Sequence, residues 1–182
     1  IAEFIYKIRV KKSLKILKQQ KNQKLEKGKI SIVILSCKRL KSLKRLVDSL
    51  KFFFKEYETY KNIEIILVDN GSGEKLINWA KNINFFDRIV ALKENIGMCS
   101  ALNNIYKELN SEFTMLIEDD FIINYKKPFL LDCVDLFNEF PEIGIIRLKN
   151  QNNWGKSFRN IAPLRKFREM SFWTWLPSFN YR

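Results

Sequence analysis

The feature that most constrains the fold is a nearly continuous apolar run, Ile30–Leu35, which reads Ile-Ser-Ile-Val-Ile-Leu. Runs of this kind are typical of strands that are covered on both faces, as in parallel sheets. Ile63–Val68 and Phe113–Ile117 have a similar β-branched and aromatic bias. Between the first two runs, apolar residues recur at three- and four-residue steps, which predicts an amphipathic helix over Leu40–Phe54.

The alternation of strand and helix patterns continues along the chain. The expected strands are Ile30–Leu35, Ile63–Val68, Arg88–Leu92, Phe113–Ile117 and Ile143–Leu148. The expected helices are Leu40–Phe54, Glu74–Lys81, one that opens at Asn95-Ile96-Gly97 and one with Pro128 in its first turn. Such alternation predicts an α/β fold with a mostly parallel sheet flanked by helices. Lys149–Arg168 is expected to be irregular, and Phe172–Trp175 to form an aromatic patch.

Length and charge predict one domain preceded by a basic segment. The 182 residues carry a net charge of +13, and residues 1–29 hold ten Lys/Arg against Glu3 and Glu26. We expect a basic, helical linker or stem over 1–28 and the folded domain over 29–182. The helix Phe4–Gln20 offers a contact with a membrane surface or nucleic acid, although a solvated stem is the favoured alternative. The first residue is not methionine, so we expect a piece of a longer protein. The sequence does not identify the compartment, for which a cytoplasmic or membrane-associated place is favoured.

Two amino-acid types limit the possible chemistry. The chain has no histidine, which excludes Ser-His-Asp and Cys-His nucleophilic sites and His-liganded zinc within it. Cys37, Cys99 and Cys133 are far apart, so neither a zinc knuckle nor a disulfide framework is indicated.

Three consecutive acids, Glu118-Asp119-Asp120, follow the Phe113–Ile117 run. Side chains alternate along a strand, so Asp119 should point away from its two neighbours. Mg²⁺ is usually held by one or two carboxylates together with substrate phosphates, which makes a cation site the natural use of this cluster. A solvated acidic turn is the alternative. Asp69 ends the Ile63–Val68 strand, and because ligands of parallel sheets bind at the carboxyl ends of strands, both acidic clusters should share one edge.

The usual glycine-rich phosphate loops are missing. The residues after the first strand read Ser36-Cys37-Lys38-Arg39-Leu40, where a dinucleotide-binding domain has Gly-x-Gly-x-x-Gly. P-loop proteins and sugar nucleotidyltransferases also need glycines at such a position. A phosphate would therefore be held by a metal and basic side chains.

Four segments together resemble the nucleotide-sugar-binding half of GT-A-fold glycosyltransferases of the family 2 type. Val33–Arg39 is similar to the family's opening strand and Thr-Tyr-Asn-Arg-like turn, and Ile65–Ser72 to its Val-Asp-Asn-x-Ser segment. Glu94–Gly97 is similar to the start of its Asn-x-Gly helix, and Met115–Asp120 to its Asp-x-Asp strand. The resemblance covers about Ile30 to Leu148.

The resemblance has two departures. Cys37 and Lys38 replace the usual aromatic residue and asparagine, and Glu118 stands where aspartate is commoner. The Glu-Asp-Asp version resembles that of some N-acetylglucosaminyltransferases.

The resemblance implies a role for seven residues. The nucleotide-sugar-binding residues would be Ser36, Arg39, Asp69, Asn95, Glu118 and Asp119, and the ligand of Mn²⁺ or Mg²⁺ would be Asp120. Asp69 would bond the base, with an Asx turn as the alternative. Ser36 and Arg39 would line the base and ribose pocket, or serve as ordinary turn and helix-start residues. Asn95 would lie near the diphosphate or only cap its helix.

The implied activity is transfer of a hexosyl or N-acetylhexosaminyl group from a UDP- or GDP-sugar to a hydroxyl of a glycan, lipid or protein, with inversion. The catalytic residue is not identified. Glu169 is the only acid after Glu142, so the base is expected in sequence beyond Arg182. Trp173 and Trp175 would cap the sheet, with stacking on a sugar as the alternative. A non-catalytic nucleotide-sugar-binding or scaffold domain is the competing hypothesis, and nucleic acid is disfavoured because the acidic edge would repel phosphate.

Overall fold

The computed structural model describes residues 24–55, 62–123, 129–141, 143–146, 164–167 and 170–173. The chain divides into two units, residues 1–126 and 127–182, and each is described by itself. Within the described residues, no helix has the length and apolar character needed to cross a bilayer.

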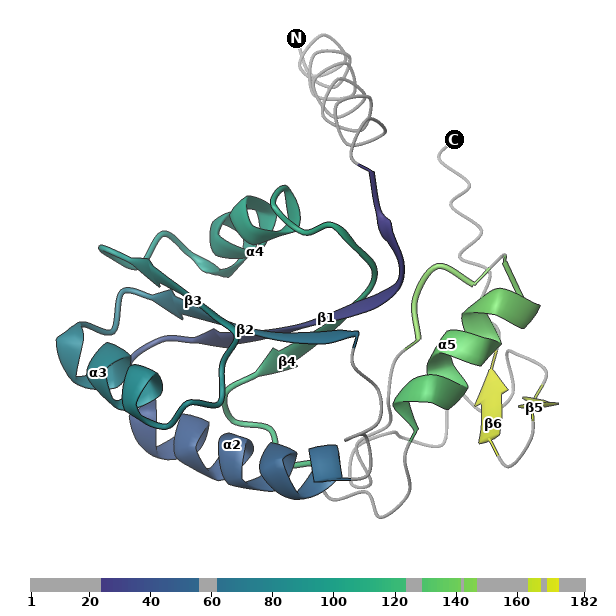
Figure 1. Ribbon diagram of the computed structural model, residues 1–182, viewed down its shortest axis with the longest axis horizontal. Coiled ribbons are helices and arrows are strands. Elements are labelled where there is room, and N and C mark those ends of the chain that lie inside the picture. Colours follow the sequence, from purple (N-terminus) through teal and green to yellow (C-terminus); the bar gives the residue numbers. More distant parts are fainter. Residues whose placement is uncertain are drawn as a thin grey trace, which may run out of the picture. The chain divides into compact units, whose positions relative to one another are not determined.

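The first unit is built on a four-stranded sheet. Its strands are β1 (Glu26–Ser36), β2 (Ile63–Asn70), β3 (Arg88–Leu92) and β4 (Ser111–Glu118). They lie in the order β3-β2-β1-β4, and every pairing is parallel (Figure 1). The predicted parallel α/β architecture is therefore confirmed.

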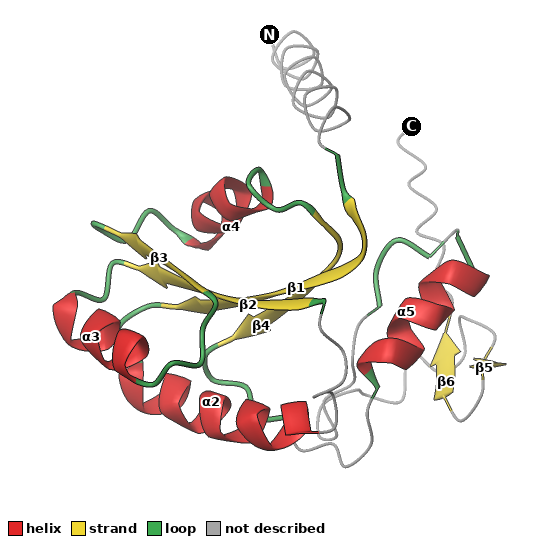
Figure 2. Cartoon of the chain, in the orientation of Figure 1, coloured by secondary structure: helices red, strands yellow, loops and turns green. Residues whose placement is uncertain are grey.

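Three helices cover the two faces of this sheet. They are α2 (Leu40–Phe54), α3 (Glu74–Asn82) and α4 (Met98–Tyr106). Figure 2 shows α2 and α3 on one face and α4 on the other. On the α4 face, Val33 of β1 and Val68 of β2 are buried with Ala101 and Ile105 of α4. Central strands that are packed on both faces explain the continuous apolar runs in the sequence.

β1 begins at Glu26, four residues before the predicted start. The Glu26 amide donates to the Asn110 carbonyl at 2.7 Å, and the Gly28 amide donates to Glu112 Oε2 at 2.7 Å. Glu26 pairs with Ser111 of β4, and the register against β4 shifts between Glu26 and Ile30. Residues 26–28 therefore belong to the sheet and not to the predicted linker, whereas the predicted helix Phe4–Gln20 lies outside the described residues.

The second unit contains α5 (Leu130–Glu139) and an antiparallel pair, β5 (Leu164–Phe167) and β6 (Met170–Trp173). The predicted strand at 143–148 is wrong for its described part, because 143–146 has no regular structure and Ile145 is exposed. Gly144 weakens strand formation there, since it has no side chain to pack. β5 lies in a stretch predicted to be irregular. Pro128, Glu169 and Trp175 lie outside the described residues.

Candidate functional site

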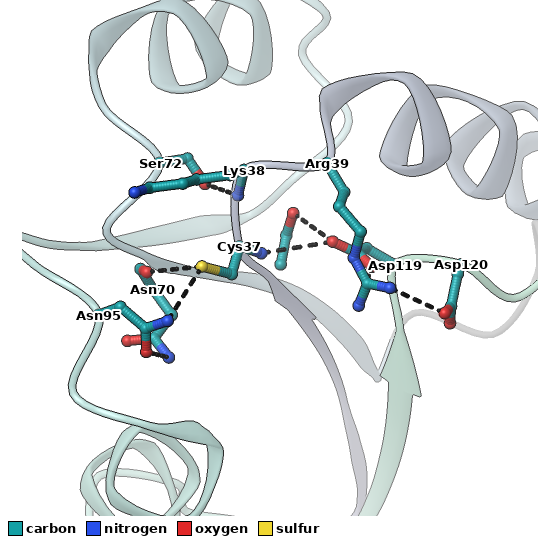
Figure 3. A network of polar contacts seen from close by, with 9 residues as sticks. Cys37, Lys38, Arg39, Asn70, Ser72, Asn95, Asp119 and Asp120 are labelled. Carbon is teal, nitrogen blue, oxygen red and sulfur yellow. Dashed lines mark hydrogen bonds and ion pairs between the residues drawn. The ribbon is translucent and has the colours of Figure 1, made fainter.

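The carboxyl ends of β1, β2 and β4 meet at one edge of the sheet. Ser36 pairs in register with Asp69, and Leu35 pairs with Glu118. Asp69 and the acidic run Glu118–Asp120 therefore lie on either side of the end of β1. They share one edge of the sheet, as the sequence predicted. We call this region, formed by residues 36–39, 69–73, 94–97 and 118–120, the rim (Figure 3).

Asp119 is completely buried and holds the β1–α2 loop. Its Oδ2 accepts hydrogen bonds from Ser36 Oγ at 2.8 Å and from the Cys37 amide at 3.3 Å. Its Oδ1 lies 2.8 Å from Arg39 Nη2, a charge–charge contact without the alignment of a hydrogen bond. A buried carboxylate is tolerated when it is paired and bonded in this way. In this arrangement Asp119 positions the loop. Its contact with a nucleotide sugar stays a prediction.

Arg39 joins the two aspartates of the acidic run. Its Nη1 lies 2.9 Å from Asp120 Oδ2, while Nη2 contacts Asp119 (Figure 3). Arg39 and Asp120 are each about half exposed, at 49% and 46%, so this second contact is open to solvent. The predicted alternation is present, with Asp119 turned inward and Asp120 outward. The sequence placed Arg39 in a base pocket, and the structure adds that its guanidinium lies against the acids.

Asp69 is buried, with 1% of its surface exposed, and only part of its hydrogen-bonding capacity is used. Its Oδ2 accepts the Ser72 amide at 3.0 Å, three residues on, whereas the Asx turn expected as the alternative would bond two residues on. Ser72 Oγ in turn accepts the Lys38 amide, so the turn is tied to the β1–α2 loop at 2.6 Å. Asp69 Oδ1 has no hydrogen-bond partner among the described residues. Buried oxygens without a partner are rare in folded proteins, so Asp69 Oδ1 is the first candidate in the rim for a contact with a ligand.

An asparagine pair links the β2–α3 turn to the entry of α4. Asn70 Nδ2 donates to Asn95 Oδ1 at 2.9 Å, and the Ile96 amide donates to Asn70 Oδ1 at 3.0 Å. Asn95 Oδ1 also accepts the Gly97 amide at 2.8 Å, two residues on, which is an Asx turn. The N-cap of α4 is Gly97, so the alternative that Asn95 caps the helix is not what the structure has. Asn95 Nδ2 lies 3.4 Å from Cys37 Sγ. Neither Asn70 nor Cys37 was predicted as a site residue, although Asn70 stands beside Asp69 in the turn-forming sequence.

Backbone geometry brings two loops of the rim close together. Gly71 has φ +79°, and a Cβ built there would lie 2.5 Å from the Asn95 amide nitrogen and from the Glu94 carbonyl carbon. Only glycine fits this conformation and this approach. Lys38 also has positive φ, at 57°, which asparagine tolerates better than lysine does. The resembled family has asparagine at that position.

The comparison with protein families settles the relationship. The profile described as Glycosyl transferase family 2 matches residues 31–182. The chain belongs to glycosyl transferase family 2.

Individual relatives agree with this membership. The chain is 28% identical over 102 residues to a poly-beta-1,6-N-acetyl-D-glucosamine synthase of Staphylococcus epidermidis, and 29% identical over 101 residues to that of Staphylococcus aureus. Each match covers 52% of this chain and 24% of the relative, so the chain matches about a quarter of each curated relative's length.

The fold is also that of a solved glycosyltransferase. The crystal structure of S. aureus TarS 1-349 in complex with UDP-GlcNAc matches with a TM-score of 0.50 and 22% identity, over 61% of this chain and 31% of that chain. The expected GT-A fold is thereby confirmed, with its parallel sheet flanked by helices on both faces.

A metal ion fits the rim only together with other ligands. Within the part of the chain that the structure describes, no three acidic or cysteine side chains gather to hold a cation by themselves. Mg²⁺ commonly binds through one or two carboxylates and completes its shell with water and substrate phosphates. Asp120, half exposed beside Glu118, fits that donor set, provided that Arg39 shares or releases Asp120 Oδ2.

Proposed function

We propose that the rim binds a nucleoside diphosphate sugar and that the chain is the donor-binding part of a glycosyltransferase. The observation that carries the proposal is the buried Asp69 Oδ1, which has no hydrogen-bond partner in the described part of the chain and lies at the strand end next to the acidic run. Membership of family 2 supports the same assignment.

Asp69 would select the base. A carboxylate oxygen accepts hydrogen bonds and cannot donate them, so it suits a base with a ring N–H. Uracil and guanine have such a ring N–H, whereas neutral cytosine and adenine donate only through an exocyclic amino group. The family resemblance favours uracil or guanine, so UDP- and GDP-sugars are the proposed donors. UDP-N-acetylglucosamine is the first to test, because TarS is named in complex with UDP-GlcNAc and the curated relatives are named as N-acetylglucosamine polymer synthases.

Asp120 would bind Mn²⁺ or Mg²⁺ together with the diphosphate. The cation supplies Lewis-acid assistance to the departure of the diphosphate. Arg39, held by Asp119, would place its positive charge beside the oxygens of the diphosphate. Asn95 and Gly97 would set the path of the loop before α4, whose amino end favours negative charge.

The acceptor side of the reaction lies outside these residues. Inverting transfer needs a base that deprotonates the acceptor hydroxyl, and we propose that sequence beyond Arg182 supplies it. The acceptor would be a hydroxyl of a glycan, lipid or protein.

Titration calorimetry with Mn²⁺ and UDP, GDP or CDP tests the donor site. We expect UDP or GDP to bind, CDP to bind weakly, and Asp69→Asn to lower the affinity about tenfold or more, since a hydrogen bond to a charged group contributes about 1.5–3 kcal/mol. Asp120→Asn should reduce the effect of Mn²⁺ on binding. Asp48→Asn, on the exposed side of α2, is the matched control and should bind like the wild type. Equal affinity in wild type and Asp69→Asn would reject the base contact.

A non-catalytic binding module is the second candidate, because no base is assigned in this chain. It predicts binding of UDP-N-acetylglucosamine without release of UDP. Measuring UDP release by the chain and by a longer form that includes sequence beyond Arg182 distinguishes the two.

A further inference from the structure

The outer face of α2 and α3 carries an excess of positive charge among the described residues. Along α2 and its C-cap, the exposed side chains at three- and four-residue steps form one stripe. Its members are Lys41, Lys44, Arg45, Asp48, Lys51, Phe52 and Lys55. Five of the seven are basic and one is acidic. The exposed residues Lys75 and Lys81 of α3 add two more basic groups, against Glu74.

Like charges at helical spacing within the stripe lower the stability of α2 in the isolated protein. Lys41 and Arg45 are four residues apart, and so are Lys51 and Lys55, an arrangement in which like charges destabilise a helix. Among the described residues, no acidic side chain pairs with Lys41, Arg45 or Lys55. An external anionic partner would relieve this repulsion.

Aromatic rings lie directly beside these charges. Lys44 Nζ is 5.6 Å from the centre of the Trp79 ring, and Lys51 Nζ is 5.9 Å from that of Phe85. These contacts join α2 to α3 and to the loop that follows it, so the surface is continuous. Figure 1 shows the two helices on the same face of the sheet. Phe52, with 69% of its surface exposed, stands between Lys51 and Lys55 on the stripe.

We infer that this basic and aromatic face of α2 and α3 binds the surface of an anionic phospholipid bilayer. Lysine and arginine attract anionic headgroups, and exposed aromatic side chains enter the boundary between headgroups and acyl chains. A single-stranded nucleic acid fits less well, because Phe86 contacts both Trp79 and Phe85 edge to face, and these rings do not offer a groove of open faces. The inference does not depend on the proposed function. Arg39, a residue of the rim, directly precedes α2. Binding of the bilayer through this face would therefore also bring the rim close to the bilayer.

Vesicle co-sedimentation of the full chain tests the inference, with phosphatidylcholine vesicles that contain or lack phosphatidylglycerol. The face variant is Lys41→Gln/Arg45→Gln/Lys55→Gln. The matched control is Lys24→Gln/Lys27→Gln/Lys107→Gln, which removes the same charge at exposed positions elsewhere. We expect binding only to anionic vesicles and a loss of about a hundredfold in the face variant, because each basic residue near the surface contributes about 1 kcal/mol. Phe52→Ser should weaken binding severalfold at unchanged charge.

Other outcomes would overturn the inference. An equal loss in the control variant would assign binding to net charge or to the basic leader. A face variant that keeps its affinity for anionic vesicles would show that the face does not bind the bilayer. If that variant loses affinity only for DNA or RNA in a parallel titration, the face would be assigned to nucleic acid. Thermal melting of both variants checks that they fold, which is expected since all six positions are exposed.

Discussion

At the scale of single residues, the rim depends on a charge inside the protein. The buried Asp119 carboxylate accepts from Ser36 and Cys37 and neutralises Arg39, so it fixes the loop that opens α2. Its loss leaves a hydroxyl and an amide without an acceptor.

We therefore expect Asp119→Ala to lower the free energy of unfolding by about 2 kcal/mol, less than the roughly 3–5 kcal/mol of a broken buried ion pair because Arg39 can rehydrate. Urea denaturation measures the change. Asp48→Ala, which removes an exposed carboxylate from α2, should change stability by no more than about 0.5 kcal/mol. Equal stability of the two variants would show that Asp119 is not the anchor of the loop.

The residues of the rim were predictable where they end a strand and unpredictable where they meet across loops. Asp69 and Asp119 follow apolar runs, so strand alternation and the parallel sheet place them. The Arg39 bridge and the Asn70–Asn95 bond depend on loop paths that the sequence does not encode by any periodicity. Cys37 was read only as a departure from the family pattern, yet its sulfur lies between Asn70 and Asn95.

At the scale of elements, the rim depends on how closely the β2–α3 and β3–α4 loops approach. Gly71→Ala would place a methyl group against the backbone of Glu94 and Asn95, whereas Gly73, with φ +91°, has nothing within 4 Å of a built Cβ. We expect a loss of about 3 kcal/mol for Gly71→Ala and about 1 kcal/mol for Gly73→Ala, the latter from backbone conformation alone. Thermal or urea unfolding compares them. Similar losses would mean that the loops separate without cost.

α5 offers a separate test through its cysteine. Burial, with a smaller contribution from Asp132, raises the pKa of Cys133 from 9.0 to about 11. The stabilisation linked to this thiol is present below about pH 9 and is lost as the pH rises through 11, because unfolding then releases a proton. At pH 8, a thiol reagent should modify the exposed Cys99 much faster than Cys133. Peptide mass spectrometry follows both sites, and equal rates would contradict the burial of Cys133.

Elements were predictable in proportion to the strength of their pattern. The helix Leu40–Phe54 was placed with its observed ends, because apolar residues recur along all its turns. The start of β1 was missed, since Glu26 and Gly28 join the sheet through their backbone amides and not by apolar side chains. β5 and β6 were missed for a related reason. Each has four residues, and backbone pairing of such short strands leaves little pattern in a basic sequence.

At the scale of the whole molecule, the first unit contains the entire rim, while the family match continues through the second. The sheet brings three strand ends together, so residues more than 80 positions apart in sequence, such as Ser36 and Asp119, share hydrogen bonds. Nucleotide binding would then be a property of the first unit, whatever the acceptor.

Hydrogen exchange of the full chain, with and without UDP and Mn²⁺, tests this central claim most directly. The account predicts slower exchange at the amides of three rim segments at once, those of Cys37–Arg39, Gly71–Gly73 and Asn95–Gly97. Slower exchange confined to one of these segments, or to residues outside the rim, while calorimetry shows UDP bound, would contradict it.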